Sequence, residues 1–556
     1  MKKPLMLTTL ALAVAACSVN RDESAVGVPA PAEKTVVENR KAEAEVAYGA
    51  KAQQQSLAQK RQLATAPVAD YASSQLVRHP HRPHIAHIVE ERDTYQGTVD
   101  NPVKSTAGDP LSTFSVDVDT ASFSVVRRYL NEGRMPPEDA VRTEEIINAL
   151  RYEPLSGLSA AQPLGLETRI MQTPWNAKTR LLQVRLNAWE PEQAQLPDSN
   201  YVFLIDVSGS MQGEDRIGLL KRAFSVMLGK LKPTDTVSLV TYASGSRTVL
   251  EPTPAKDRHA ILQALQGLTA GGSTHASDGI QRAYQLARRA FIEGGNNRVI
   301  LATDGDVNVG LRGEALVDMI ERQRDQGIYL TVLGVGKGNY MDAQLEPLAN
   351  KGDGNYYYLD SFREARRVLV SGLKGTAYTL AKDVKLQVEF NPAVVAEYRL
   401  IGYNNRQLAH ADFNNDAKDA GDIGAGHNVT ALYEITLTDS QYRFVDERRY
   451  SSETRTSGNH KELALVKLRY KSPQGGASVR RDQVVYRRAL EHLQPTTPAV
   501  LAAGFAEKLR RSPHLAGFDW EKLQVLTREL DLRQDEMTDL KRMVDSAAVL
   551  QGGIAG

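Results

Sequence analysis

Residues 201–211 read YVFLIDVSGSM, an apolar run that passes directly into Asp206, Ser208 and Ser210. In an extended segment alternate side chains point to the same side, so these three oxygen-bearing side chains leave the strand together. A run that is apolar on both faces is typical of a parallel strand covered by helices on both sides. We therefore expect a buried strand whose carboxyl end carries a functional loop.

The pattern of this stretch recurs on its carboxyl-terminal side. Short apolar runs at 235–243, 297–304 and 328–336 alternate with amphipathic segments such as RIGLLKRAFSVMLGKL and EALVDMIERQRDQG. Apolar strands separated by amphipathic helices indicate a mostly parallel sheet with helices on both faces. The sequence thus predicts an α/β, Rossmann-like domain over residues 199–376.

Two later loops of this predicted domain also carry oxygen side chains. GGSTHASDGI contains Thr274 just before a helix, and LATDGDVNVG places Asp304 directly after an apolar strand. Because the functional loops of an open parallel sheet gather at the carboxyl ends of its strands, we expect these residues to meet the first loop. Carboxylates and hydroxyls without nitrogen or sulfur ligands suit a hard divalent cation, Mg²⁺ or Mn²⁺.

The three motifs DVSGSM, GGST and ATDGD, in this order, resemble the metal-ion-dependent adhesion site of a von Willebrand factor type A domain. The resemblance implies that the ion is held by the following residues: Asp206, Ser208, Ser210, Thr274 and Asp304. Three of these ligands are neutral hydroxyls, so we expect the bound ion to attract an Asp or Glu of a partner protein as a further ligand. The function implied is metal-dependent adhesion or assembly.

The flanks extend the resemblance. FSVDVDTASFSVVRRYLNEGRMPP and EFNPAVVAEYRLIGYNNR are similar to the YfbK-like bacterial lipoproteins, which have a domain on each side of the A domain. We expect an α+β domain over 98–198 and a C-terminal domain over 377–556, β-sandwich-like at 377–478 and helical at 479–556, with QVVYRRALEHL as its first helix. One alternative stays open, namely that TRLLQVRLNAW and KDVKLQVEFNP pair, which would make the A domain an insertion in one β domain.

The amino terminus predicts export and lipid attachment. Two lysines precede an apolar segment that ends at Cys17, as in a signal peptide over 1–16. VAAC resembles a bacterial lipobox, which implies a lipid anchor at Cys17, and Ser18 suggests sorting to the outer membrane. Residues 17–97 are poor in aromatics and predict a disordered tether. We expect a protein of the bacterial cell envelope that is anchored to the membrane by lipid.

Composition and motifs argue against several other functions. The 68 basic and 67 acidic residues leave a net charge of +1, so no basic footprint for nucleic acid is expected. Asp117 and Asp119 imitate the D-x-D of dehalogenase-type phosphotransferases, but the downstream motifs of that chemistry do not follow. Ser210 lacks the G-x-S-x-G context of a hydrolytic nucleophile. We expect no enzyme and no small-molecule substrate. The alternative functions are an envelope scaffold with a non-functional metal site and, less favoured, a phosphotransferase or hydrolase.

Overall fold

The structure is a computed structural model that describes residues 93–273, 276–305, 314–338, 341–446, 459–515 and 517–552. All of them belong to one compact unit, Ile88–Gly556. The predicted signal peptide, Cys17 and most of the predicted tether lie outside the described residues, and so does Thr274. In the described part of the chain, no helix is long and apolar enough to cross a membrane.

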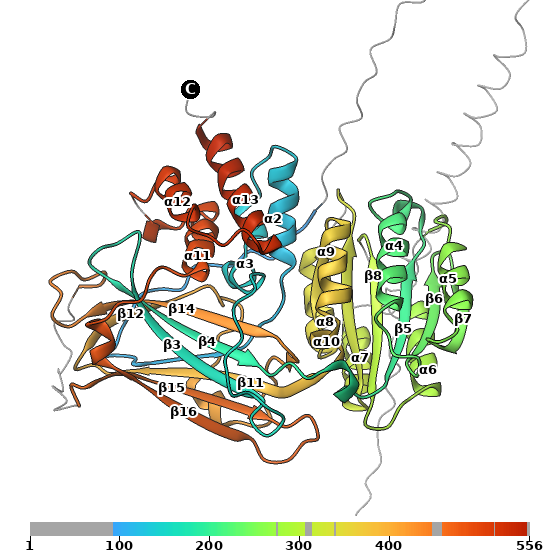
Figure 1. Cartoon of the computed structure of the whole chain (residues 1–556), viewed down its shortest axis with the longest axis horizontal. Coiled ribbons are helices and arrows are strands. Elements are labelled where there is room, and N and C mark those ends of the chain that lie inside the picture. Colours follow the sequence, from blue (N-terminus) through green and yellow to red (C-terminus); the bar gives the residue numbers. More distant parts are fainter. Residues whose placement is uncertain are drawn as a thin grey trace, which may run out of the picture. The chain divides into compact units, whose positions relative to one another are not determined.

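Residues 199–376, here called the central domain, contain a six-stranded sheet in the order β10-β9-β8-β5-β6-β7. Figure 1 labels β8, β5, β6 and β7 of this sheet. Neighbouring strands are parallel except at the β6–β7 edge, which is antiparallel. The strands are β5 (Ser199–Asp206), β6 (Thr236–Tyr242), β7 (Ser246–Pro254), β8 (Asn296–Thr303), β9 (Ile328–Val335) and β10 (Tyr356–Leu359). The predicted α/β domain is thus confirmed, with β5 in the interior of the sheet.

The β5 stretch is apolar on both sides because each face of the sheet has its own core. Val202 and Leu204 belong to a core shared with α6, α7 and α8, whereas Tyr201, Phe203 and Ile205 belong to a second core shared with α4, α5 and α9. The helices of the domain are α4 (Ile217–Leu228), α5 (Arg258–Gln266), α6 (Ala276–Arg289), α7 (Glu314–Asp325), α8 (Asp342–Lys351), α9 (Phe362–Arg366) and α10 (Leu373–Ala377). Burial on both faces leaves the strand ends as the place for a polar site.

The remaining strands form a sandwich of two sheets. One sheet has the order β1-β12-β14-β4-β3, and the other has the order β13-β11-β15-β16, with β2 paired to β11. The strands are β1 (Lys104–Ser105), β2 (Leu111–Ser115), β3 (Leu164–Gln172), β4 (Arg180–Ala188), β11 (Thr379–Phe390), β12 (Val395–Ile401), β13 (Ile423–Gly424), β14 (Asn428–Leu437), β15 (Glu462–Lys471) and β16 (Val479–Tyr486). Their inner faces share one apolar core.

Strands from before and after the central domain are neighbours in both sheets. β4 pairs with β14, with Val184 opposite Ala431, and β2 pairs with β11, with Phe114 opposite Leu386. The regions 98–198 and 377–556 are therefore not two separate domains, and the central domain is inserted between two halves of one sandwich. The direct pairing suggested between residues 179–189 and 382–392 is wrong, because β4 and β11 lie in different sheets.

Helices from both ends of the chain also pack together. α2 (Ala121–Asn131) and α3 (Thr143–Asn148) share an apolar core with α11 (Pro498–Leu509), α12 (Trp520–Thr527) and α13 (Asp535–Gly552). The predicted helix over 483–493 is wrong, because its first residues belong to β16 and a 3₁₀ turn follows. Only Val485 of β16 is buried, so this edge strand carries no apolar alternation that the sequence could display. The helical region begins at α11 and not at residue 479.

Because the regions before and after the central domain share their sheets, a truncated chain can test whether they form one sandwich. A fragment of residues 98–376 lacks β11, which pairs with β2, and β14, which is one of the two neighbours of β4, so both strands would expose apolar faces and unpaired backbone groups. We expect this fragment to be insoluble or to show no cooperative unfolding of its flanking part when its circular dichroism is followed in urea. A soluble fragment with a cooperative transition in that part would contradict the shared sandwich.

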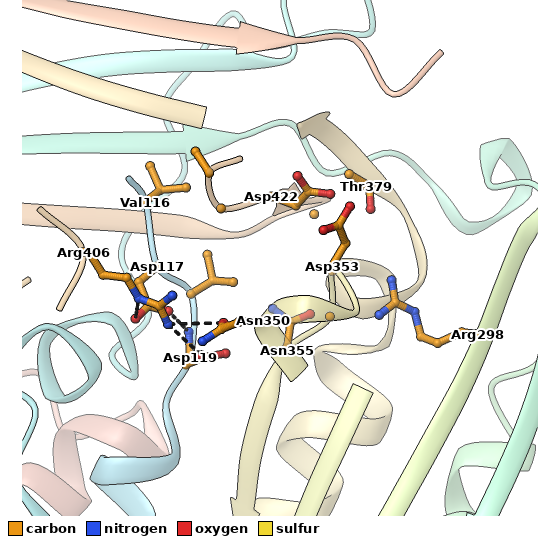
Figure 2. Close-up of a pocket in the computed structure, with 16 residues that line it drawn as sticks. Val116, Asp117, Asp119, Arg298, Asn350, Asp353, Asn355, Thr379, Arg406 and Asp422 are labelled. Carbon is orange, nitrogen blue, oxygen red and sulfur yellow. Dashed lines mark hydrogen bonds and ion pairs between the residues drawn. The ribbon is translucent and has the colours of Figure 1, made fainter. Parts of the chain in front are cut away.

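Buried polar groups line a pocket between the central domain and the sandwich (Figure 2). Its volume is about 50 Å³. Asp353, from the turn after α8, and Asp422, beside β13, point toward one another in this pocket (Figure 2). Burial raises the pKa of Asp353 to about 6 against the opposing charge of Lys382, whose Nζ lies 3.5 Å from Asp353 Oδ2. Burial and the Asp353 charge also raise the pKa of Asp422.

The raised pKa of Asp353 predicts that the stability of the folded protein depends on pH. Because the folded-state pKa of Asp353 exceeds its ordinary value of 3.8, this group stabilises the fold fully below pH 4, and that contribution is lost as the pH rises through about 6. Asp353→Asn, which also tolerates the left-handed backbone there (φ 44°), should be about 1–3 kcal/mol more stable than the wild type at pH 8 and equal to it near pH 4. Denaturation midpoints at both pH values test this.

The matched control for Asp353→Asn is Asp318→Asn, at an exposed carboxylate of α7. We expect it to leave the midpoints unchanged at both pH values. A stabilisation by Asp353→Asn that is equal at pH 4 and pH 8 would contradict the ionic origin of the effect.

Candidate functional site

The site lies at the carboxyl ends of two adjacent parallel strands. Asp206 is the last residue of β5, and Asp304 directly follows β8, which pairs with β5. In the loop after β5, the Ser208 N–H donates to Asp206 Oδ1 at 2.8 Å. A 3₁₀ turn follows, and its Met211 is fully buried, which fixes the loop against the domain core. The strand register and this anchor hold the first loop beside Asp304.

Oxygen atoms of four predicted ligands form one connected cluster, here called the oxygen cluster, of Asp206, Ser208, Ser210 and Asp304. Ser208 Oγ and Ser210 Oγ are 3.0 Å apart, and Ser210 Oγ donates to Asp304 Oδ1 at 2.9 Å. The amide of Ser208 links these groups to Asp206. The structure therefore brings together four of the five residues that the sequence predicts.

The fifth predicted ligand, Thr274, lies outside the described residues, but the loop that precedes it is described. The Gly271 N–H donates to the Val207 carbonyl at 2.7 Å, and the Gly209 N–H donates to the Gly272 carbonyl at 3.0 Å. The second loop therefore lies against the first loop through two backbone hydrogen bonds. Gly272 has a φ of +94°, a backbone conformation that residues with a Cβ atom rarely adopt and that glycine tolerates.

Sequence reasoning missed two side chains that contact the oxygen cluster. Thr303 Oγ1 donates to Asp206 Oδ2 at 3.1 Å, and Arg216 Nε lies 3.4 Å from Asp304 Oδ2. Thr303 stands next to Asp304 in the sequence, so its position at the strand end could have been noticed. Arg216 carries no comparable signal, because its contact depends on the path of the loop between β5 and α4.

Both carboxylates of the oxygen cluster are buried. Asp206 is 1% exposed and Asp304 is 4% exposed. Burial raises the pKa of Asp206, while hydrogen bonds from Ser208 and Thr303 oppose the rise. Burial likewise raises the pKa of Asp304, while Ser210 and Arg216 oppose it. In the part of the chain that the structure describes, Arg216 is the one basic side chain paired with either carboxylate, so the cluster favours further positive charge.

The spacing of the oxygens fits a small octahedral cation. Neighbouring ligand oxygens at 2.0–2.1 Å from Mg²⁺ and at right angles are about 2.9 Å apart. The two side-chain oxygen distances along the cluster, 3.0 and 2.9 Å, are those of O–H···O hydrogen bonds and are also compatible with such an edge. No group of three or more His, Cys, Asp or Glu residues suited to a metal ion occurs among the described residues. The oxygen cluster has only two carboxylates, and the other two of its four residues are serines.

Asp117 and Asp119, which resemble a phosphotransferase motif, accept hydrogen bonds from other residues of the fold. Arg406 Nε donates to Asp117 Oδ2 at 2.9 Å, and the Tyr356 N–H donates to Asp119 Oδ1 at 2.8 Å. The Asp119 N–H also donates to Asp117 Oδ1 at 2.9 Å, a local contact within the motif. These carboxylates tie the segment after β2 to the central domain.

Comparison with protein families agrees with this geometry. Residues 200–369 match the von Willebrand factor type A domain, residues 375–550 match the family "Uncharacterized protein YfbK, C-terminal", and residues 89–183 match the family "von Willebrand factor". The Escherichia coli (strain K12) protein described as "Uncharacterized protein YfbK" is 42% identical over 447 residues, which cover 77% of this chain and 76% of that protein.

More distant relatives share smaller parts. Inter-alpha-trypsin inhibitor heavy chain H3 of Mesocricetus auratus is 26% identical over 44% of this chain, and the match covers 30% of the length of that relative. A solved von Willebrand factor type A structure from Catenulispora acidiphila superposes with a TM-score of 0.39 at 16% identity, over 70% of this chain and 87% of that one.

The inserted α/β domain and its family match define a protein built on a von Willebrand factor type A domain. Over most of its length, the sequence is shared with the Escherichia coli relative. The chain belongs to the YfbK family.

Proposed function

We propose that this protein is a metal-dependent protein-binding module, in which the oxygen cluster holds Mg²⁺ or Mn²⁺ and an Asp or Glu of a partner protein completes the site. The observation that carries the proposal is the convergence of two buried carboxylates and two serine hydroxyls at spacings that suit an octahedral ion. Thr274 is proposed as the fifth ligand, because the loop that leads to it lies against the first loop. We propose no catalytic role for these residues.

The location of the oxygen cluster favours binding of an acidic side chain from another protein. Ser208 is buried, whereas Ser210 is exposed, so the oxygen cluster opens to solvent on the Ser210 side. When bound, a divalent cation would supply a coordination position that accepts a carboxylate oxygen. Asp206 and Asp304 together balance two positive charges, and Arg216 beside Asp304 adds one more. The loaded site would therefore carry a net positive charge, which favours an acidic partner.

The test is a capture experiment with matched variants. The purified protein is immobilised and exposed to envelope extract in the presence of Mg²⁺ or of a chelator. We expect partners that are retained by the wild type with Mg²⁺, are lost with the chelator and are lost with Ser210→Ala. Asp215→Asn, an exposed residue of the same loop, should retain them. Partners that bind Ser210→Ala and chelated protein as well as the wild type would refute the proposal.

A second function, that of a structural envelope scaffold, is favoured by one observation. Several buried arginines pair with carboxylates across the boundary of the central domain, such as Arg127 with Asp360 and Arg406 with Glu346. Such pairs would hold the inserted domain in a fixed position. Under this alternative, Ser210→Ala would leave cell-envelope integrity unchanged, whereas deletion of residues 199–376 would not.

We propose the bacterial cell envelope as the location, with a lipid on Cys17 anchoring the protein to the outer membrane. The support is the basic, then apolar amino terminus that ends in VAAC. Cys17→Ser should release the protein from the membrane fraction. Membrane association that is unchanged in Cys17→Ser would contradict the lipid anchor.

A further inference from the structure

Arg216 occupies a special position at the rim of the oxygen cluster. It lies between the loop after β5 and the start of α4, with Nε 3.4 Å from Asp304 Oδ2. Its Nη2 donates to the Lys337 carbonyl at 2.8 Å, in the turn after β9. The side chain is 23% exposed. The guanidinium therefore has one side on a proposed metal ligand and another side on a backbone carbonyl of a different loop.

The turn after β9 is shaped to receive this side chain. Gly336 has a φ of +75°, and a Cβ at that position would overlap the Arg216 side chain. The Gly336 carbonyl accepts a hydrogen bond from Tyr358 Oη at 2.5 Å, which holds the turn in place. Tyr358 Oη in turn accepts from Arg128 Nη1 of α2 at 3.0 Å. Arg216 is thus placed beside Asp304 by a backbone turn that is itself fixed to a neighbouring helix.

The charges near Asp304 mean that the position of Arg216 affects the binding of a divalent cation. Asp304 is buried, and Arg216 supplies the positive charge that its carboxylate meets. A divalent cation on the same carboxylate would share it with a fixed cation of like charge, and repulsion at this range weakens binding of the ion. Glutamine, which is uncharged and shorter than arginine, would remove this repulsion while it keeps a polar side chain at this position.

We propose that Arg216 is a resident counter-ion of Asp304 that lowers the affinity of the oxygen cluster for divalent cations. This inference rests on the proposed function, since it concerns the same site. Arg216 acts as a positioning and affinity-setting residue: it stabilises the Asp304 carboxylate when no ion is present, and the ion must compete with it. The Gly336 turn keeps the guanidinium within reach of the carboxylate.

The test is calorimetric titration of the purified protein with MgCl₂ alone. Arg216→Gln should bind Mg²⁺ about ten times more tightly than the wild type, because one like charge is removed from a partly exposed position. Arg216→Lys keeps the charge and should stay within about threefold of the wild type. Gly336→Ala displaces the Arg216 side chain and should change affinity in the same direction as Arg216→Gln. Arg289→Gln, at an exposed arginine of α6 that pairs with Glu251, should have no effect.

The outcomes separate this inference from the proposed function. If the wild type binds Mg²⁺, Ser208→Ala does not, and Arg216→Gln binds with wild-type affinity, the counter-ion role is overturned and the metal site survives. If Arg216→Gln and Arg216→Lys both lose stability without a change in affinity, Arg216 is only a loop anchor and the inference fails. If Arg216→Gln binds Mg²⁺ where the wild type shows no binding, the inference is supported. If no variant binds, the proposed function and the inference fail together.

Discussion

Replacement of Arg142 by methionine is expected to lower the free energy of unfolding by about 3–5 kcal/mol. Arg142 is 3% exposed and precedes α3. Its guanidinium pairs with Glu145 at 2.8 Å, with Glu346 at 3.0 Å and with Asp342 at the start of α8. Methionine fills much of the volume of the arginine side chain but leaves these buried carboxylates without a compensating positive charge. Removal of one partner of a buried ion pair is strongly destabilising because the remaining charge is buried and unpaired.

The loss should depend on pH. Burial raises the pKa of Glu145 to about 8, although Arg142 opposes the rise. A carboxyl whose folded-state pKa is above its ordinary value of 4.5 costs stability as the pH rises through that interval. Without Arg142 this cost increases at high pH, whereas protonation removes it at low pH. The difference between Arg142→Met and the wild type should therefore be larger at pH 8 than at pH 5.

Urea denaturation at the two pH values measures this difference. Arg151→Met is the matched control, because Arg151 is 56% exposed and lies 3.6 Å from Glu536, so its loss should change stability by less than about 1 kcal/mol. Equal midpoints for Arg142→Met and Arg151→Met would show that the buried pairs do not hold the central domain to its flanks.

The second large effect concerns the metal site. Asp206→Asn is expected to weaken Mg²⁺ binding at least about a hundredfold, or about 2.7 kcal/mol, because it removes a charged ligand from the oxygen cluster. Asparagine has nearly the same shape, and its Oδ1 can still accept from the Ser208 N–H. The metal-free protein should not be destabilised, since burial already raises the pKa of Asp206 and so disfavours its charge in the folded state.

Thermal unfolding with and without Mg²⁺ separates these two effects. The wild type should gain stability on addition of Mg²⁺, by mass action, while Asp206→Asn should not. Asp215→Asn, a change of the same chemistry at an exposed position in the same loop, should respond as the wild type does. An Mg²⁺-dependent shift in Asp206→Asn equal to that of the wild type would exclude Asp206 as a ligand.

The parts of the structure that the sequence predicts are those set by local pattern. β5 and β8 are apolar on both faces, which predicts parallel strands whose carboxyl ends lie at one edge of the sheet; the structure then pairs the two strands and brings Asp206 and Asp304 together. β7 was not predicted, because none of its residues is buried and it shows no apolar run. The same holds for β16, where the helical reading was wrong.

The remaining features depend on contacts between distant segments. Several strands of the sandwich, though not β16, alternate in sequence, but alternation does not say which strand is the neighbour of which. Arg142 meets Asp342 two hundred positions away, and Arg216 meets Lys337 across 121 positions. A single sequence holds no local signal for such pairs, which is why the buried ion pairs and the counter-ion of Asp304 were recognised only in the structure.

The central claim is that the oxygen cluster holds one divalent cation. Calorimetric titration of the purified wild type and of Ser208→Ala with MgCl₂ tests it most directly. The predicted result is a single Mg²⁺ per wild-type chain, no binding to Ser208→Ala, and metal-free unfolding curves that coincide for the two proteins. Mg²⁺ binding of equal affinity and stoichiometry in Ser208→Ala, or no binding to the wild type and to Arg216→Gln alike, would contradict the claim.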